Sequence, residues 1–480
     1  MKRLATIVPL ALPLALLLTI CVTAAHSQTY TNDDEWKVYE AFHQAFWCSS
    51  KLNYKSDTSQ PSASHRGNGD RDGDHSGCSA AIWCQAVYFD MAVNAYKRRL
   101  EEGADATTLR KAKNRMTTVF NGEKAHYVDF NFDDCNTNNG WFVYDDIQWW
   151  TCALARAYEV SVMGGGAVDN YLALAEKAFC RVWYGSQKVG DDGSYADPEE
   201  GFTGGMFWEW QPIDKPRPHA DNGFKSACIN FPTVIACCLL HNLVPEERQK
   251  PTEAYPTCQT KEFYLEKAKE IYAWAKDHFC DDNFPGRVAD GIHGGAPEWA
   301  DHLYNQATYL GASCLLYKLT DDEQYLTNAR ESADYVKAQM CSSRRGKKIL
   351  PVEKGYEQGV YAAIFAQYMK LLVYDCGQND YMDWISQNIQ YGYDNRDTTR
   401  DLQDADFAKQ PSADDVIESY GASALPALMI MFPADDTQDI KQATAQRCHD
   451  TMACSIDGKA MPSQSGRGLR IVGGRKMLHR

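Results

Sequence analysis

The stretch YLGASCLLYKLTDDEQYLTNARESADYV (residues 309–336) contains two helical patterns separated by a short turn. In each pattern, Ala, Leu and Tyr recur three and four residues apart, which places them on one face of a helix. The turn between Thr320 and Asp322 is so short that the two helices form a pair. The same loose spacing of Ala and Tyr recurs in CALARAYEV (152–160) and YLEKAKEIYAWA (264–275). The repeating unit of this chain is therefore predicted to be a pair of helices.

Helical periodicity dominates the whole chain, and the alternation typical of strands is scarce. The long connections at 185–222 and 281–302 are rich in Gly, Asp and Trp. A solenoid of helix pairs would have a similar period, but it needs more regular repeats and capping units. We therefore expect an all-α fold, an (α/α)6 toroid or barrel, with inner helices around a cavity and the long loops at its mouth. The expected helices, twelve in six pairs, span residues 36–52, 80–99, 106–121, 145–162, 169–184, 223–242, 261–279, 303–318, 322–340, 359–374, 379–392 and 416–431.

The two ends of the chain differ in composition from the helical part. A basic start and an apolar run to about Val22 are followed by small residues. This pattern is typical of a secretory signal peptide over residues 1–27, and an uncleaved membrane anchor is the alternative. We expect a helical domain over residues 28–435 and a polar, basic-ended tail without stable structure over residues 436–480. The mature protein is then expected to be secreted, with association to a cell wall as an open alternative.

Cysteine content and charge agree with export. The chain has 17 cysteines, and loss of Cys21 with the leader leaves 16. No CxxC pair and no zinc-finger spacing occurs, so disulfide bonds in an oxidising compartment are the favoured interpretation. Cys237 and Cys238 are neighbours and are expected to have different fates, one of them as a buried thiol. The net charge of −15 argues against nucleic acid and anionic membranes as partners.

The polar segment 53–79 is predicted to be a loop, and part of it resembles a calcium-binding loop. Asn68, Asp70 and Asp72 stand at alternate positions. The twelfth position, however, is Ser79, where a calcium loop has a bidentate Glu. An ordinary polar loop is therefore the preferred interpretation. The histidines show no HExxH spacing and no phosphate-binding Gly-rich loop occurs, so neither a metal nor another cofactor is expected.

The stretch WFVYDDIQWW (141–150) places Asp145 and Asp146 side by side among bulky aromatic residues. The turn signal NTNNG (136–140) precedes it and a helical pattern follows, so both aspartates are expected in the first turn of a helix. One interpretation is that they cap this helix and complement its dipole. The other is catalytic, because at a helix start both carboxyl groups can project into one cavity at the ~5–5.5 Å separation of a retaining glycosidase.

Further motifs follow the aspartate pair in a fixed order. The first is YDDIQWWTCALARAYEV (144–160), and then come TGGMFWEW (203–210), FKSACINFPTVIACCLL (224–240), GRVADGI (286–292) and LYNQATYLGASCLLYKLTDDEQYL (303–326). Together they resemble glycoside hydrolase family 76, the endo-α-1,6-mannanases and their fungal cell-wall relatives, over roughly residues 36–431. Ser226 stands where the family has Asn, and Ala307 where it has Gly. These two departures leave the details of substrate binding open.

The resemblance implies an (α/α)6 fold, in agreement with the helices predicted from periodicity. It also implies that Asp145 is the nucleophile and Asp146 the general acid/base. Other residues of these motifs are candidates for substrate binding, because sugar rings stack on aromatic faces and sugar hydroxyls need donors and acceptors. They are Trp149, Trp150, Trp210, Asn230, Asp290, Tyr304, Asn305 and Gln306. Core packing is the alternative for the tryptophans, and a helix-end or turn role for the polar residues; Glu209 is a rival carboxylate.

The expected function is that of a secreted retaining endo-α-1,6-mannosidase, which hydrolyses α-1,6-linked mannan or mannose-containing glycans by double displacement. Two alternatives stay open. A transglycosylase on the same site would pass the sugar to a hydroxyl of another glycan, and so join mannose-bearing glycans to cell-wall polysaccharide. A glycan-binding barrel without activity would need no catalytic carboxylates, so the intact pair of Asp145 and Asp146 argues against it.

Overall fold

The computed structural model describes residues 29–63, 78–133, 141, 143–187, 204–210, 224–246, 259–293, 296–353 and 357–434, and several short strands between 453 and 479. The expected signal peptide (1–27) and the calcium-like positions 68–72 lie outside these residues, as does the turn at 136–140. The expected boundaries of the helical domain and of the tail therefore stay predictions.

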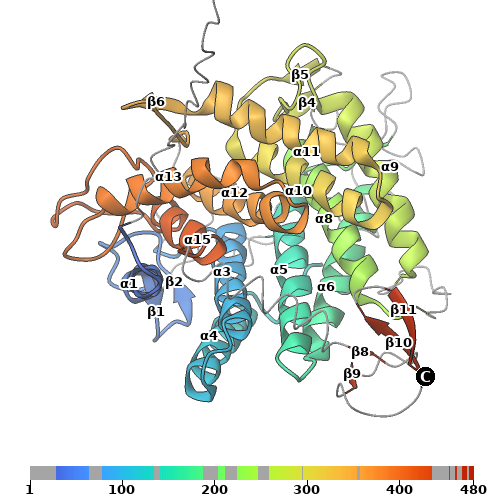
Figure 1. Cartoon of the computed structure of the whole chain (residues 1–480), viewed down its shortest axis with the longest axis horizontal. Coiled ribbons are helices and arrows are strands. Elements are labelled where there is room, and N and C mark those ends of the chain that lie inside the picture. The colour runs from blue at the N-terminus through green and yellow to red at the C-terminus, as the bar shows by residue number, and fades with distance from the viewer. Residues whose placement is uncertain are drawn as a thin grey trace, which may run out of the picture.

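Within the described residues, six helices form a closed inner ring, in which each helix packs against the next and the last packs against the first. They are α3 (Ile82–Glu101), α5 (Tyr144–Met163), α8 (Ala227–Leu243), α10 (Leu303–Thr320), α12 (Tyr361–Lys370) and α15 (Ala424–Met431). The outer helices that pack on this ring are α1 (Asn32–Phe46), α4 (Ala106–His126), α6 (Asp169–Val182), α9 (Lys261–Phe279), α11 (Glu323–Tyr335) and α13 (Met382–Asp394). In Figure 1, α4 and α9 lie at the periphery and α10 lies near the centre. This arrangement confirms the predicted (α/α)6 barrel.

The two layers differ in how much of each helix is buried. In the inner helix α8, every side chain from Ala227 to Cys238 is buried. In the outer helix α9, the buried residues follow one face, as Tyr264, Ala268 and Ile271 do. A helix that is apolar on all sides needs neighbours on all sides, whereas an amphipathic helix needs them on one. The composition of each helix therefore explains its layer.

The inner helices begin at the same end of the barrel, which we call the mouth. Near the starts of α3 and α12, the ring centroids of Trp83 and Tyr361 are 6.2 Å apart. Tyr304 at the start of α10 stacks on Tyr361 at 4.1 Å, and Trp149 of α5 lies 6.1 Å from Trp83. The opposite end of the barrel is called the base. Because Asp145 and Tyr304 lie near the starts of α5 and α10, the fold brings both to the mouth.

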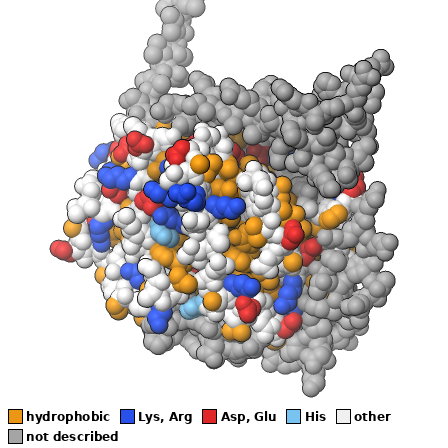
Figure 2. Space-filling model, turned by 90° about the horizontal axis from the view of Figure 1, so that it is seen from below, with side chains coloured by type: hydrophobic (Ala, Val, Ile, Leu, Met, Phe, Trp, Pro, Cys, Tyr) orange, Lys and Arg blue, Asp and Glu red, His pale blue; other side chains and the backbone are white. Residues whose placement is uncertain are grey.

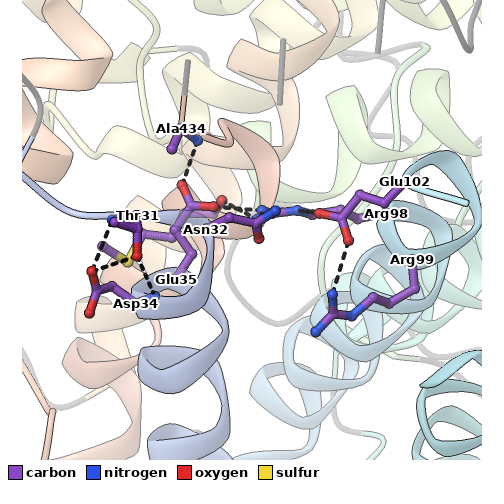
Figure 3. Close-up of polar contacts among 9 residues, drawn as sticks. Thr31, Asn32, Asp34, Glu35, Arg98, Arg99, Glu102 and Ala434 are labelled. Atoms are coloured by element: carbon purple, nitrogen blue, oxygen red, sulfur yellow. Dashed lines mark hydrogen bonds and ion pairs between the residues drawn. The ribbon is translucent and has the colours of Figure 1, made fainter. Parts of the chain in front are cut away.

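At the base, a buried ion-pair network joins the first and last helices (Figure 3). Arg98 of α3 pairs with Glu35 of α1 at 2.5 Å and with Glu102 at 2.7 Å. Arg98 also donates to the carbonyl oxygen of Met429 in α15, and Glu35 accepts a hydrogen bond of 2.8 Å from the backbone N–H of Ala434. Since Arg98 and Glu35 are almost fully buried, this network fixes how the two ends of the helical domain meet.

The connections contain short antiparallel strands that the sequence pattern does not predict, because two or three residues are too few to show alternation. β1 (Trp47–Cys48) pairs with β2 (Asn53–Tyr54), β3 (Lys225–Ser226) with β4 (Gly291–His293), β4 with β5 (Ala296–Glu298), and β6 (Ser342–Arg344) with β7 (Lys347–Ile349). Within the expected tail lie β8 (Ala453–Cys454), β9 (Ala460–Met461), β10 (Gly468–Val472) and β11 (Arg475–His479). The sheet of β3, β4 and β5 joins the start of α8 to the loop that carries Asp290.

Several single turns of helix complete the described structure. The π-helical turns η1 (Trp183–Gln187), η2 (Val336–Met340) and η4 (Leu371–Asp375) extend α6, α11 and α12. The 3-10 turns η3 (Glu357–Val360) and η5 (Asn379–Tyr381) lead into α12 and α13, and α14 (Ser419–Ala422) leads into α15. The helix expected at 416–431 is thus divided into two at Ser423.

Several cysteines of the inner helices serve as core residues. Cys152, Cys228, Cys237, Cys238 and Cys314 are thiols, and all five are buried. A thiol in an apolar environment behaves as a small hydrophobic side chain. At these positions the structure corrects the expected disulfide framework, and both members of the neighbouring pair in α8 are buried thiols. For cysteines outside the described residues, such as those at positions 135, 258 and 448, disulfide formation stays a prediction.

Among the described helices, none has the length and the apolar character that crossing a membrane requires. Figure 2 shows one face of the molecule, on which Lys and Arg side chains lie beside Asp and Glu side chains with apolar residues between them. This face therefore carries charges of both signs.

Candidate active site

Asp145 and Asp146 lie in the first turn of α5, as the sequence predicts. The N-cap position is Val143, whose side chain makes no capping hydrogen bond. Instead, the helix start is held by a neighbouring segment: the Tyr144 N–H donates to the Trp208 carbonyl at 2.8 Å, and Val143 forms a β-bridge with Glu209. Neither aspartate is therefore the N-cap residue. Asp146 is buried, whereas Asp145 is partly exposed at the mouth.

The segment 204–210, which supports the start of α5, owes its path to two glycines. Gly204 and Gly205 have positive φ angles of 87° and 68°, and a Cβ on Gly205 would come within 2.3 Å of the Trp274 ring. Lys225 donates to the Gly204 carbonyl, and its ammonium lies 5.1 Å from the Trp274 ring centroid. Burial lowers the pKa of Lys225 to about 7. The Gly-Gly motif thus lets the segment pack flat against Trp274.

Asn230 of α8 fixes the same segment from inside. Its amide oxygen accepts from the Met206 N–H at 2.8 Å, and its amide nitrogen donates to the carbonyls of Met206 and Ser226 at 3.1 and 2.8 Å. The side chain is fully buried. The structure therefore corrects the expectation that Asn230 contacts a sugar: it positions the segment that supports the catalytic helix.

Asp290 is the second carboxylate that the fold brings to the mouth. Its Oδ1 accepts hydrogen bonds from the Tyr304 hydroxyl at 3.2 Å and from the Asn305 amide at 2.8 Å. Burial, together with the nearby Asp145 and Asp290 carboxylates, raises the pKa of the Cys228 thiol. Asp145 and Asp290 thus both lie close to Cys228. The structure brings together four of the residues expected in the site: Asp145, Asp290, Tyr304 and Asn305.

A row of aromatic side chains crosses the mouth beside these carboxylates. It runs from Trp149 through Trp83 and Tyr361 to Tyr304, with neighbouring centroids 4.1 to 6.2 Å apart. The Trp83 indole N–H donates to Glu357 at 2.6 Å. The sequence analysis missed Trp83, Tyr361 and Glu357. Trp83 could have been found, because it lies near the start of the helix predicted over residues 80–99, as Asp145 and Tyr304 lie near the starts of theirs.

Comparison with known proteins identifies the architecture. The profile of Glycosyl hydrolase family 76 matches residues 51–423, most of the described chain. The chain belongs to glycosyl hydrolase family 76. It is therefore a member of a family of glycoside hydrolases, and the resemblance drawn from its motifs is confirmed. A search of curated proteins gives no match.

Solved structures of family 76 share the fold. An α-1,6-mannanase from Salegentibacter sp. HEL1_6 is 21% identical with a TM-score of 0.61, over 83% of this chain and 98% of that chain. An inactive variant of that mannanase, in which two consecutive aspartates are replaced by alanine, was solved with α-1,6-mannotetrose (20% identity, TM-score 0.61, 83% and 98% covered). A family 76 mannosidase from Bacteroides thetaiotaomicron VPI-5482 is 17% identical with a TM-score of 0.60, over 87% of this chain and 98% of that chain. At these identities the likeness establishes the shared barrel.

The remaining aromatic candidates are placed in the core of this family 76 barrel. Trp150 is fully buried, donates from its indole N–H to the Ile82 carbonyl at 3.1 Å and stacks on Phe89. The guanidinium of Arg181 lies 4.6 Å over the ring of Trp210. The structure therefore places Trp150 in the core, which corrects the expectation of a sugar platform there. For Trp210 and Trp149, contact with a sugar stays a prediction.

Two polar candidates also have structural positions. Gln306 is fully buried, donates to the Val288 carbonyl at 3.1 Å and accepts through its backbone from Ser332 of α11 at 2.9 Å. Glu209, the rival carboxylate, is exposed and meets Val143 through its backbone. Gln306 therefore braces the loop before Asp290 instead of reaching the mouth. In the described part of the chain, no group of three or more His, Cys, Asp or Glu side chains could hold a metal ion.

Proposed function

We propose that this family 76 member is a retaining endo-α-1,6-mannosidase that hydrolyses α-1,6-linked mannan or mannose-containing glycans. The observation that carries the proposal is the position of Asp145 and Asp146, consecutive in the first turn of α5 at the mouth of the barrel. The inactive α-1,6-mannanase variant with two consecutive aspartates replaced, solved with α-1,6-mannotetrose, supports it. We also propose that residues 1–27 direct export, so that the substrate is met outside the cell.

The two aspartates have the different surroundings that double displacement needs. Asp145 is partly exposed at a helix start, where the dipole favours a negative charge, and this suits the nucleophile. Asp146 is buried, and burial opposes a charged carboxylate, which suits a proton donor. Asp145 attacks the anomeric carbon while Asp146 protonates the leaving oxygen. Asp146 then takes a proton from water, which attacks the glycosyl-enzyme ester, and the two inversions give net retention.

The other mouth residues bind and orient the sugar in this proposal. Asp290 accepts from a sugar hydroxyl while the Tyr304 hydroxyl and the Asn305 amide hold its carboxylate in place. Tyr304, the partly exposed ring of the aromatic row, provides an apolar surface that a pyranose ring packs against, and Tyr361 stacks behind it. In this proposal Asp290 binds a hydroxyl group, and bond cleavage depends on the aspartate pair.

Product analysis on linear α-1,6-mannan tests the proposal. The full chain is incubated with the polymer, with and without a mannoside acceptor, and the products are separated by length. We expect shorter chains with new reducing ends in both arms, and proton NMR should show the α-anomer before mutarotation. A β-anomer that appears first would overturn the double displacement. Products that lengthen only when acceptor is present would favour the transglycosylase, and an intact polymer would overturn the proposed substrate.

A further inference from the structure

A second cavity adjoins the mouth on the side of α10. It has a volume of about 300 Å³ and lies between the start of α10, the end of η2, the residues after β7 and the turn η3. Its wall includes His302, Met340, Pro351, Val352, Glu353 and Gln358. This volume is at the lower end of the range that ligand pockets have.

The polar part of this cavity is rigidly built. Oε1 of Glu353 accepts from the Leu303 N–H at 2.8 Å, which ties the pocket wall to the first residue of α10, and Oε2 lies 3.4 Å from Nδ1 of His302. Asp301, at the rim, accepts from Arg287 at 2.8 Å and from the Tyr335 hydroxyl at 3.2 Å. Each carboxylate therefore has a cationic or strong donor partner. The pocket suits a neutral ligand with hydroxyl groups better than a cation.

The wall of the cavity also has an apolar part. Val352 is 47% exposed, and Pro351 and Met340 are partly exposed beside it. A wall that combines apolar side chains with a few donors and acceptors matches a pyranose ring, which has apolar faces and a polar edge.

His302 joins the wall of the cavity to the row of aromatic side chains at the mouth. The His302 ring lies 5.8 Å from Tyr361 and 6.0 Å from Tyr304, centroid to centroid. Tyr304 in turn donates to Asp290, whose charge, like that of Asp145, acts on the Cys228 thiol. A glycan bound across the mouth can therefore reach the cavity with a residue distant from the bond that is cleaved.

We propose that the cavity behind His302 is a distal sugar subsite that binds a neutral pyranose of the substrate beyond the scissile bond, either the next unit of the chain or a side branch. The proposal rests on the proposed function for the identity of the glycan. Gln358 and the free edge of His302 supply hydrogen bonds to its hydroxyls, and Val352 packs against its apolar face. Longer or branched substrates then gain affinity that the shortest chains lack.

Two variants test the subsite by different routes. Val352→Trp fills the cavity from an exposed position, and Gln358→Ala removes one polar group. Each is assayed on linear α-1,6-mannooligosaccharides of increasing length and on branched mannan. We expect the ratio of kcat/KM between long and shortest cleaved substrates to fall about tenfold for Val352→Trp and less for Gln358→Ala. Loss on the linear series identifies a chain unit, and loss on branched mannan alone identifies a side branch.

The control is Val162→Trp, another exposed valine, which lies near the end of α5 at the base. It should leave the ratio unchanged. An unchanged ratio in both pocket variants, or an equal fall in the control, would overturn the subsite. If the wild-type chain cleaves none of these glycans, the proposed function is wrong. Titration calorimetry with the same oligosaccharides then still tests whether the pocket binds a sugar. Binding that Val352→Trp does not weaken, or no binding at all, would then overturn it.

Discussion

At the mouth of the barrel, Asp290 is held by neutral donors, whereas at the base Glu35 is held by a guanidinium. At the mouth, the Tyr304 hydroxyl and the Asn305 amide donate to Asp290. At the base, Arg98 lies 2.5 Å from Glu35 in an almost fully buried pair, and the backbone of Ala434 completes the network (Figure 3). Both ends therefore contain ionisable groups that are withdrawn from water.

The difference reflects what each end has to do. A neutral donor orients a carboxylate without cancelling its charge, so the group can still bind a hydroxyl or exchange a proton. A buried guanidinium cancels the charge and costs several kcal/mol if it loses its partner, roughly 3–5. Substitutions at the mouth should accordingly lower activity and change stability little. Substitutions at the base should lower stability and change activity little.

The largest expected effect is on turnover at the mouth. Asp145→Asn and Asp146→Asn each remove one charge at nearly constant shape, and kcat should fall about 10³-fold or more because nucleophile and proton donor act as a unit. The melting temperature should change little. The control is Asp383→Asn, an exposed acid in the first turn of the outer helix α13, which should retain full activity. If either mouth variant had turnover near that of the wild type, the aspartate pair would not be catalytic. Its role would then be to interact with the dipole of α5.

The next effect is on stability at the base. Arg98→Met leaves Glu35 buried without its cation, and the free energy of unfolding in urea should fall by about 3–5 kcal/mol. Arg115→Met is the control, because its pair with Glu40 is partly exposed, with side chains 22% and 48% accessible, and should cost at most about 1 kcal/mol. Activity per folded molecule should stay constant in both. Equal losses of stability would show that burial of the base network contributes nothing extra.

A smaller effect on stability is expected in the segment 204–210, which supports the start of α5 at the mouth. Gly205→Ala combines a positive φ with a clash against Trp274, and should cost about 2–4 kcal/mol of unfolding free energy. Turnover should fall as well, since segment 204–210 holds the Tyr144 N–H. Gly103→Ala has a similar φ of 65° and nothing within 4 Å of the new Cβ, so it measures the backbone cost alone. Equal costs for the two variants would show that contact with Trp274 is not the constraint.

The smallest effect concerns pH. The hydrogen bond to Glu353 raises the pKa of His302 above its ordinary value of 6.5. The stability that this pair contributes is therefore complete below pH 6.5 and is lost as the pH rises through the raised pKa. The melting temperature of the wild type minus that of His302→Gln should fall over this window, by an amount equivalent to less than about 1 kcal/mol.

The control for this pH dependence is His43→Gln. Burial lowers the pKa of His43 to about 3, so its stabilising effect is lost below pH 6.5 and is constant above it. A difference for His302→Gln that stays constant, or that rises with pH, would contradict the charged pair with Glu353.

The helices could be predicted because their signals are local. Helix α9 spans Lys261–Phe279, the same limits that the sequence predicts. The first helix begins at Asn32 instead of residue 36, because Thr31 and Asp34 form a capping box that periodicity alone does not reveal. At its end, β1 begins at Trp47, so the helix stops before residue 52. Errors in the predicted limits thus come from caps and from partners elsewhere in the chain.

The aspartate pair could be found from the sequence because adjacency and a helix start are both local properties. The aromatic candidates could not be sorted in the same way. Trp149 and Trp150 are neighbours in an inner helix that is buried nearly all round, so no apolar stripe tells which of them faces the mouth. Trp83 and Tyr361 belong to helices almost 280 residues apart, and only closure of the ring brings them to the pair.

The sequence by itself determined the helices, their pairing and the two consecutive carboxylates at the start of one of them, since hydrophobic period, short turns and neighbouring charges act within a few residues. The tertiary structure alone decided which helices became inner and which of their faces reach the mouth. It also decided which polar residues hold the wall of the barrel together and which lie in the candidate active site. Asn230 shows the reason: a buried amide must satisfy its hydrogen bonds, and here the backbone of Met206 lies where it can both donate and accept. The nitrogen of the Gln306 amide likewise finds the Val288 carbonyl. Those partners are remote in the chain or separated by a turn, and their positions exist only once the barrel has closed.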